Sequence, residues 1–505
     1  MNSFDEYVDY DAAGLAELVA RGELSPLDMV KAAGCQIDKW NPRINALTFH
    51  DARQAAEYAD RKDLSGTDYK GVPFLVKDLV TEVKGFPHTC GSKALASYVS
   101  AEDCELVKRY RQAGFNIMGA TNTAEFGLLP VTESAHTGVT RNPWNTECNA
   151  GGSSGGAAAA VACGIVPVAG ATDGGGSIRI PAAFTGTFGF KPSRGLVPQD
   201  PMGEPWDGAA VTHVISRTVR DSFQVLNKTL GMTASAPYAP VSGIESGNKA
   251  LSPRGKKIGV CFTSPLSMPV SENNLKALRK CVAALEARGY EIVEIDRLYN
   301  GYDLLDSFCP VLFGQVSADL QTIGAKLGKP VTRKDVEPAT WLISEIGRHV
   351  SARDFALAKQ RWAEFRLLMA TYFCEYDFIL TPVTAIDAPL NGELVPDPAE
   401  LKALKFVSAI KLERYLPNSR QFRENFYQSF EPFPFTLMAN ITGIPAFSAP
   451  VWVDGSDMPS AVQAMGPIGS DAELMNLALT IEQELPWIDT YKRLHQLTDN
   501  QEKPA

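Results

Sequence analysis

The 505-residue sequence lacks any apolar run long enough to cross a membrane, and its first residues do not resemble a signal peptide. Nowhere do about eighteen apolar residues follow one another. The opening stretch, MNSFDEYVDYDAAG, is acidic, whereas a signal peptide begins with basic residues followed by an apolar segment. These absences predict a cytoplasmic protein that does not act at a membrane.

Positive charge is also scarce. The chain has 48 Lys and Arg against 58 Asp and Glu, a formal net charge of −10, and no basic run. Nucleic-acid binding depends on Lys and Arg that displace counterions from phosphates. The composition therefore excludes nucleic acid as the main partner, and the apolar content of 45% is that of an ordinary globular protein.

The patterns that bind metals and nucleotide cofactors are absent as well. The six histidines never form HExxH, and the nine cysteines stand singly and never form CxxC. The glycine-rich GGSSGG has no GK[ST] ending, and DGGGS does not fit GxGxxG. We therefore predict no metal, no cofactor and reduced cysteines that are mostly buried.

What the sequence does have is an alternation of amphipathic helices and short apolar strands, which predicts one α/β domain over 1–505. Strands are expected at 71–78, 116–122, 256–262, 291–296 and 377–384, with helices before and between them, among them 101–115, 271–288 and stretches within 303–374. Ser25 followed by Pro26 predicts one helix start, and Ser470 with Glu473 predicts a capping box at another. Segments 233–255 and 387–400 are expected to be surface loops.

The most unusual segment is 149–182, where two glycine-rich loops each carry serine. SSGGAAAAVACG predicts the start of a helix with unpaired amides, and DGGGS follows the apolar strand GIVPVAGAT. Successive free backbone N–H groups of this kind can stabilise a developing oxyanion. The two loops together predict nucleophilic catalysis at a serine.

Two other interpretations of the serines stay open at this point. Each serine taken alone is typical of a turn or a helix cap. GGSSG also fits GxSxG, so Ser153 could be the nucleophile of an α/β-hydrolase-type esterase with His213, His349 or His495 as base. That elbow requires a buried strand immediately before it, whereas TRNPWNTECNA is polar and turn-forming, which disfavours the esterase.

Neither loop contains a histidine, so a base must come from elsewhere. Lys77 ends the strand GVPFLVKD, which is apolar on both faces and should therefore be buried. Burial lowers the pKa of a lysine and makes the neutral amine available. The alternative is a lysine at a strand end that extends to water. Asp78 should point to the opposite face and should not neutralise Lys77.

The motifs GVPFLVKD, GATNTAEFG, GGSSGGAAAAVA, ATDGGGSIRIPAAFTGTFGFKPSRG, SRTVRD and ANITGIPAFSAPV resemble those of the amidase signature family over most of the chain. The resemblance implies a single α/β/α domain around a large mixed sheet and hydrolysis of a carboxamide. It divides the domain into N-terminal helices at about 8–42, a catalytic core at about 70–230 and a variable helical region on the substrate side at about 300–375.

The resemblance also implies roles for individual residues. Ser177 corresponds to the nucleophile that forms an acyl-enzyme, Ser153 to the bridging serine after a cis peptide bond from Gly152, and Lys77 to the base. The oxyanion hole corresponds to the backbone N–H groups of Gly174, Gly175, Gly176 and Ser177. Ser154, Asp173 and Arg179 are expected to support these groups rather than to react.

Within the family, TRNPWN, KPVTRKDVEPATW and ELPWI are similar to the branch of 6-aminohexanoate cyclic-dimer hydrolases, near the aryl acylamidases. An amidotransferase A-type subunit that delivers ammonia to a partner is the alternative, but its RYDG region has no counterpart. The aromatic stretch YQSFEPFPFTLMANITG would suit a small amide with an apolar part, unless it only packs in the core. A homodimer is compatible with these features.

Overall fold

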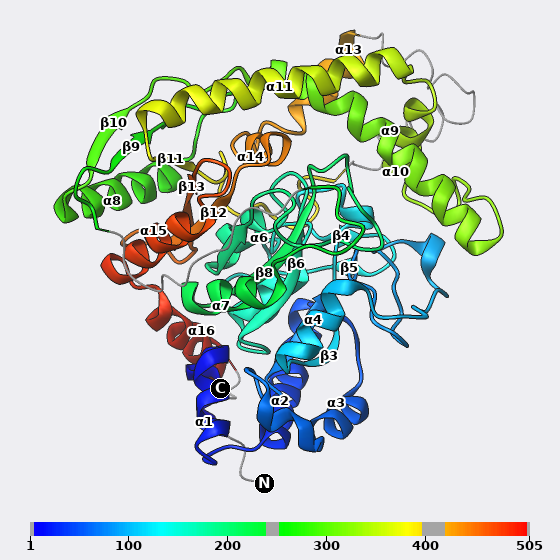
Figure 1. Ribbon diagram of the computed structural model, residues 1–505, viewed down its shortest axis with the longest axis vertical. Helices are drawn as coiled ribbons and strands as arrows, with labels where there is room; N and C mark the ends of the chain where they lie inside the picture. Colours follow the sequence, from blue (N-terminus) through cyan, green and yellow to red (C-terminus); the bar gives the residue numbers. More distant parts are fainter. Residues whose placement is uncertain (1–4, 239–251, 396–419, 502–505) are drawn as a thin grey trace.

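The computed structural model describes residues 5–238, 252–395 and 420–501, and its centre is a mixed sheet of eleven strands (Figure 1). The strand order is β1-β3-β2-β6-β8-β7-β12-β13-β11-β9-β10. The strands are β1 Leu47–His50, β2 Pro73–Lys77, β3 Asn116–Thr121, β6 Val168–Asp173, β7 Phe188–Lys191, β8 Val211–Ser216, β9 Lys257–Val260, β10 Glu291–Glu294, β11 Phe378–Pro382, β12 Ala446–Val451 and β13 Ser460–Met465. A separate pair, β4 Glu133–Ser134 and β5 Gly138–Val139, lies outside this sheet.

Helices cover the sheet on both faces, which confirms the predicted α/β class and the mixed sheet (Figure 1). The α-helices are α1 Ala12–Ala20, α2 Pro26–Ile44, α3 Ala52–Ala59, α4 Glu105–Ala113, α5 Gly155–Ala162, α6 Arg179–Thr185, α7 Val219–Thr229, α8 Glu272–Arg288, α9 Gly301–Leu327, α10 Pro338–Gly347, α11 Ala352–Glu375, α13 Arg420–Gln428, α14 Leu437–Thr442, α15 Asp471–Glu484 and α16 Ile488–Gln501. The 3-10 helices of the described segments are η1 Asp5–Asp9, η2 Lys62–Gly66, η3 Lys93–Leu95 and η4 Glu125–Gly127.

Both predicted helix starts lie at the expected residues, but one of the two predicted capping interactions does not form. Ser25 caps α2 by accepting the N–H of Asp28, with Pro26 in the first turn, as predicted. Helix α15 begins where the capping box was expected, but the box itself does not form. The Ser470 hydroxyl donates to the carbonyl of Pro467 instead, and Glu473 pairs with Lys256.

The sheet topology decides which residues can meet at the site. Strands β2 and β6 are parallel neighbours, with Leu75 opposite Ala169. Every residue of both strands is buried. Because parallel strands end at the same edge of a sheet, Lys77 at the end of β2 lies beside Thr172 and Asp173 at the end of β6.

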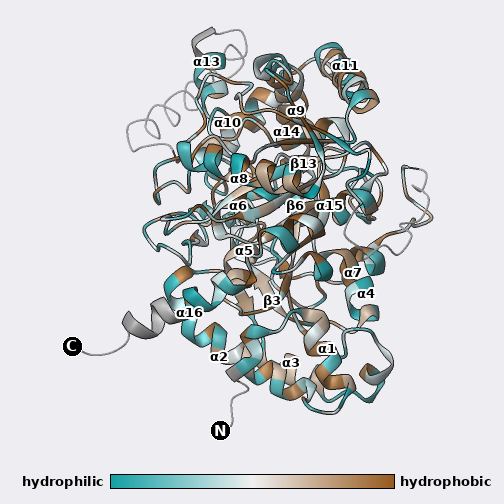
Figure 2. Cartoon of the chain, turned by 90° about the vertical axis from the view of Figure 1, so that its left-hand side faces the viewer, coloured by the Kyte–Doolittle hydropathy of each residue, from teal (hydrophilic) through white to brown (hydrophobic). Residues whose placement is uncertain are grey.

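The helices α9, α10 and α11 form a layer of their own along one side of the molecule (Figure 1, top). Their buried side chains join those of α14 in a second apolar core, which also includes Ile379 of β11, Ala446 of β12 and Met465 of β13. The region predicted to be helical at about 300–375 is therefore helical. In Figure 2 the outer helices carry both hydrophilic and hydrophobic residues, as expected for amphipathic helices with one face on a core.

Several smaller predictions can be compared with the fold. All nine cysteines are free thiols, and seven of them are buried, with Cys35 and Cys374 exposed. No helix among the described residues is long and apolar enough to span a membrane. The two predicted surface loops lie partly outside the described residues, at 239–251 and 396–400.

Candidate active site

Lys77 is fully buried at the end of β2 and is surrounded by hydroxyl groups. Its Nζ donates to Ser153 Oγ at 2.8 Å and to Thr172 Oγ1 at 2.8 Å. Burial lowers the pKa of Lys77 from 10.5 to about 7, although the charges of Asp173 and Cys90 oppose the shift. The amine is therefore available in its neutral form near neutral pH.

Asp78 follows Lys77 in the chain but does not neutralise it, as predicted. Its carboxylate accepts the N–H of Thr89 at 2.8 Å and the Thr89 hydroxyl at 2.5 Å, and it lies 3.6 Å from His88 Nδ1. Burial raises the pKa of Asp78 to about 6, and the hydrogen bonds from Thr89 oppose that shift.

Ser153 lies in the loop before α5, after the predicted cis peptide bond from Gly152. One prediction for this loop was wrong: the first amides of α5 are not unpaired. The N–H of Gly155 donates to Thr132 Oγ1 at 3.1 Å, and the N–H of Gly156 donates to the carbonyl of Asn122 at 3.2 Å. This helix start therefore has no free amides at these two positions for an oxyanion.

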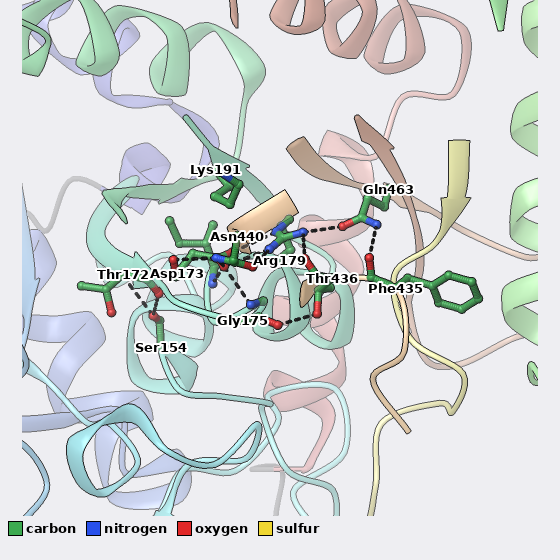
Figure 3. A network of polar contacts seen from close by, with 12 residues as sticks. Ser154, Thr172, Asp173, Gly175, Arg179, Lys191, Phe435, Thr436, Asn440 and Gln463 are labelled. Atoms are coloured by element: carbon green, nitrogen blue, oxygen red, sulfur yellow. Dashed lines mark hydrogen bonds and ion pairs between the residues drawn. The ribbon is translucent and has the colours of Figure 1, made fainter. Parts of the chain in front are cut away.

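Ser177 lies between β6 and α6 and is half-buried. Its carbonyl oxygen accepts the N–H of Ser154 at 3.3 Å, which joins the two serine-bearing loops. The Ser154 hydroxyl in turn donates to the carbonyl of Thr172 at 3.2 Å, beside the lysine (Figure 3). The three sequence-predicted residues Lys77, Ser153 and Ser177 thus come from segments that contact one another.

The backbone N–H groups of the glycine loop before Ser177 differ in whether they already donate to an acceptor. The N–H of Gly176 donates to Asp173 Oδ1 at 2.7 Å, so this amide already has an acceptor, unlike the expectation for the oxyanion hole. Within residues 5–238, 252–395 and 420–501, the N–H groups of Gly174, Gly175 and Ser177 have no acceptor. Three of the four expected donors are therefore free.

Close packing explains why two positions of this loop, 174 and 176, are glycines. A Cβ on Gly174 would lie 2.8 Å from the Trp206 ring, and a Cβ on Gly176 would lie 2.4 Å from Thr436 Oγ1. Gly176 also has a φ of +129°, which side chains rarely allow. Gly175 has more room, since its nearest neighbour would be Leu437 at 3.7 Å.

Asp173 and Arg179 form a fully buried ion pair behind the glycine loop (Figure 3). Two nitrogens of Arg179 donate to the two oxygens of Asp173, each at 2.9 Å. Burial alone would raise the pKa of Asp173, but the charge of Arg179 and hydrogen bonds from Arg179 and Asn440 hold it well below its ordinary value. Asp173 thus stays ionised and accepts the amides of Gly176 and Ile178.

Three buried polar residues from the C-terminal part of the chain complete this network and were missed by the sequence reasoning (Figure 3). Asn440 donates to Asp173 and accepts from Arg179 at 2.7 Å. Gln463 Oε1 accepts from Arg179 at 2.6 Å, and Thr436 Oγ1 donates to the Gly175 carbonyl at 2.5 Å. The signal available in the sequence was polar residues within otherwise apolar buried segments, namely PFTLMANITG and SAVQAM.

A second fully buried lysine, Lys191, lies beside this network (Figure 3). Burial and the positive charge of Arg179 lower its pKa to about 7. Its Nζ donates to the carbonyl of Pro192 at 2.9 Å, and it makes no contact with Ser153 or Ser177 among the described residues. Contact with a serine hydroxyl therefore distinguishes Lys77 from Lys191.

The three histidines of the esterase interpretation lie elsewhere. His213 is buried on β8 with its Nε2 2.9 Å from Ser222 Oγ, and burial lowers its pKa to about 3. His349 is exposed after α10, and the His495 ring packs edge-on against Trp40. Ser153 receives its hydrogen bond from Lys77 instead.

Within the described part of the chain, no group of three or more His, Cys, Asp or Glu side chains could hold a metal ion.

The Arg179–Asp173 pair gives a stability prediction. Arg179→Met should lower the free energy of unfolding by about 3 to 5 kcal/mol, because it leaves the Asp173 carboxylate buried and unpaired. Thermal and urea denaturation would measure the loss. Arg353→Met, which removes an exposed arginine 3.4 Å from Asp354, is the control and should not move either midpoint. Equal midpoints for both variants would contradict a structural role for the buried pair.

The known proteins of similar sequence and structure include several amide hydrolases. The amidase family model matches residues 28–475. The chain is 30% identical to the 6-aminohexanoate-cyclic-dimer hydrolase of Paenarthrobacter ureafaciens, over 95% of both chains. It is 32% identical to a lipoamidase of Enterococcus faecalis over 94% of this chain, but that match spans only 63% of the relative's length. The structure of a 6-aminohexanoate cyclic dimer hydrolase complexed with substrate superposes with a TM-score of 0.84 at 28% identity, covering 95% of this chain and 98% of that one.

Proposed function

The chain belongs to the amidase family and is an amide hydrolase, and from this premise we propose that it cleaves the C–N bond through an acyl-enzyme on Ser177. The observation that carries the proposal is the buried Lys77, whose pKa is lowered to about 7 and whose Nζ lies 2.8 Å from Ser153 Oγ. A base that contacts a serine hydroxyl and, among the described residues, no carboxylate can accept a proton from that hydroxyl.

In the proposed reaction, the Ser177 hydroxyl attacks the amide carbon while its proton passes through Ser153 to the neutral amine of Lys77. Collapse of the tetrahedral intermediate breaks the C–N bond, and the proton returns by the same path to the leaving amine. Water then attacks the acyl-enzyme, giving up a proton along this relay, and releases the carboxylic acid and free Ser177.

The negative oxygen of the tetrahedral intermediate requires donors that have no other acceptor. We propose the N–H groups of Gly174, Gly175 and Ser177 for this role. The Gly176 N–H donates to Asp173, which supports a role in holding the loop rather than in binding the oxyanion. Ser154, Asp173 and Arg179 act in the same supporting way, through the contacts that join the loops.

The substrate is proposed to be a small amide with an apolar part next to the scissile bond. Trp206 packs against Gly174, and Leu437 lies nearest to Gly175, so apolar side chains border the nucleophile loop. The aromatic stretch noted in the sequence includes this Leu437, whereas the buried rings of Phe433 and Phe435 fit the alternative of packing in the core. A cytoplasmic location and a homodimer stay predictions of the sequence.

A panel of amides tests the proposed function. Purified protein should hydrolyse an amide bond in at least one of three probes, namely the 6-aminohexanoate cyclic dimer, lipoamide and an anilide, with the hydrolysis product detected by mass spectrometry. Turnover by the chain alone supports a hydrolase over the alternative of an amidotransferase-type subunit, which needs a partner. Turnover of esters with no amide cleaved would contradict the proposal.

The proposed lysine base also predicts the behaviour of the histidines. His213→Gln, His349→Gln and His495→Gln should each keep kcat within about threefold of the wild type, because none of these rings contacts Ser153 or Ser177 among the described residues. Initial rates on the best probe from the panel would measure this. A folded histidine variant that loses activity as completely as Lys77→Ala would contradict the lysine mechanism and favour the esterase-type alternative.

A further inference from the structure

Thr436 stands at the start of α14 and uses its side chain for a distant loop. The side chain is fully buried, and its hydroxyl donates to the carbonyl oxygen of Gly175 at 2.5 Å. A threonine at this position commonly accepts an N–H of its own helix, but Thr436 makes no such capping bond. The hydroxyl is therefore committed to the nucleophile loop (Figure 3).

This contact fixes one end of a single peptide unit, and the other end is fixed as well. The carbonyl of the Gly175–Gly176 peptide accepts from Thr436, while its N–H donates to Asp173 Oδ1 at 2.7 Å. The peptide plane is thus held from two opposite directions by groups more than 260 residues apart in sequence. The free amides of Gly175 and Ser177 lie on the two neighbouring peptide units.

A peptide between two glycines needs such external support. Glycine adopts many backbone conformations at little cost, so a Gly–Gly peptide can rotate where other residues would resist. A bulkier residue cannot stiffen Gly176, because its φ is +129° and a Cβ there would lie 2.4 Å from Thr436 Oγ1. The close approach that requires glycine also places the Thr436 hydroxyl within reach of the loop.

We propose that Thr436 is a positioning residue for the oxyanion hole: its hydroxyl prevents rotation of the Gly175–Gly176 peptide and so keeps the neighbouring amides aimed at one point. This inference rests on the proposed function of the loop. Rotation of the peptide would break both of its hydrogen bonds, to Thr436 and to Asp173. The rotation changes the ψ of Gly175 and the φ of Gly176, and any change not compensated between these two angles moves the neighbouring peptide units that carry the Gly175 and Ser177 amides.

Removal of the Thr436 hydroxyl should leave the backbone hydrogen bond of Thr436 to Arg179 in place. The carbonyl of Thr436 accepts from Arg179 Nη1 at 2.9 Å, and this contact does not depend on the side chain. Thr436→Ser keeps the hydroxyl, and Thr436→Ala removes it, so the comparison of the two isolates the hydrogen bond. Thr442→Ala is a matched control on the same helix, because that buried hydroxyl donates to the Met438 carbonyl and not to the loop.

The experiment measures kcat, KM and inhibition by a trifluoromethyl ketone that carries the acyl part of an amide hydrolysed by the wild type. Thr436→Ala should lower kcat about 10- to 100-fold with KM nearly unchanged, somewhat less than outright loss of an oxyanion donor. The inhibition constant should rise by a similar factor, because the bound ketone carries the oxyanion. Thr436→Ser and Thr442→Ala should stay within about threefold of the wild type.

Equal kcat and equal inhibition constants for Thr436→Ala and Thr436→Ser would overturn the inference. If the alanine variant does not fold, Thr436→Cys replaces it, since a thiol fills the site but donates weakly, and it should behave as predicted for alanine. Ser177→Ala distinguishes an error in the role of Thr436 from an error in the proposed function. If Ser177→Ala is inactive and Thr436→Ala is unaffected, only the role of Thr436 is contradicted. If Ser177→Ala is active, the proposed function is contradicted.

Discussion

Ser177→Ala should reduce amide hydrolysis by about 10⁴- to 10⁶-fold, the cost of removing a nucleophile from a catalytic unit. Ser177 directly follows the three glycines of the loop, and the residues on either side, Asp173 and Ile178, have no hydroxyl group. No neighbour in the chain can therefore take over the attack. Because Ser177 is half-buried and its side chain makes no hydrogen bond among the described residues, the variant should fold as well as the wild type. The residual rate is best measured with a discontinuous assay over hours.

A covalent probe makes this prediction specific for the site. A fluorophosphonate should label wild-type protein on the peptide that contains Ser177, and Ser177→Ala should not be labelled. Ser448→Ala is a suitable control, since Ser448 is a buried serine whose hydroxyl has no hydrogen-bond partner in the described part of the chain and should not matter for turnover. Labelling of Ser153 instead would contradict the assignment and support the α/β-hydrolase-type elbow.

The sequence predicted the elements near the site well, because their signals are local. The strand ending at Lys77 is apolar on both faces, and this pattern predicts burial without any knowledge of the neighbours. The alternating helices and strands likewise predicted the α/β class. What local patterns could not provide is the pairing of β2 with β6, which places Lys77 beside Thr172. The resemblance to a family implied that Lys77 meets Ser153, and it did not predict Thr172 as a second partner.

The hydrogen-bond network around Asp173 and Arg179 was less predictable, because the residues that it joins are far apart in the chain. Asn440 lies in a segment that reads as an ordinary helix end, and nothing local shows that it contacts Asp173, 267 positions earlier. The same is true of Thr436, whose hydroxyl could equally have capped its own helix. The capping box at Ser470 failed for a related reason: its hydroxyl found a closer partner in the Pro467 carbonyl. A hydroxyl group often has several possible partners nearby in the sequence, and the folded structure decides which of them it binds.

The pH dependence of catalysis should show the state of Lys77. Its pKa of about 7 means that the amine is protonated below pH 7 and neutral above it. Only the neutral amine can accept the proton from Ser153, so kcat/KM should rise with pH and level off above about pH 8. One unit below the pKa, about a tenth of the molecules carry the neutral amine, and the rate should be about tenfold below its plateau.

Substitutions distinguish a proton acceptor from a fixed charge at this position. Lys77→Arg keeps the positive charge but cannot lose its proton, so it should be nearly as inactive as Lys77→Met, about 10³-fold or more below the wild type. Lys191 also has a pKa near 7, so it must be separated from Lys77. In Lys191→Met, the rate that remains should still rise through the same apparent pKa, because Lys191 does not contact Ser153 among the described residues. If Lys77→Arg is active and the wild-type kcat/KM is constant from pH 6 to about pH 10, Lys77 is not the base. If the rise of kcat/KM with pH disappears only in Lys191→Met, the titrating group is Lys191.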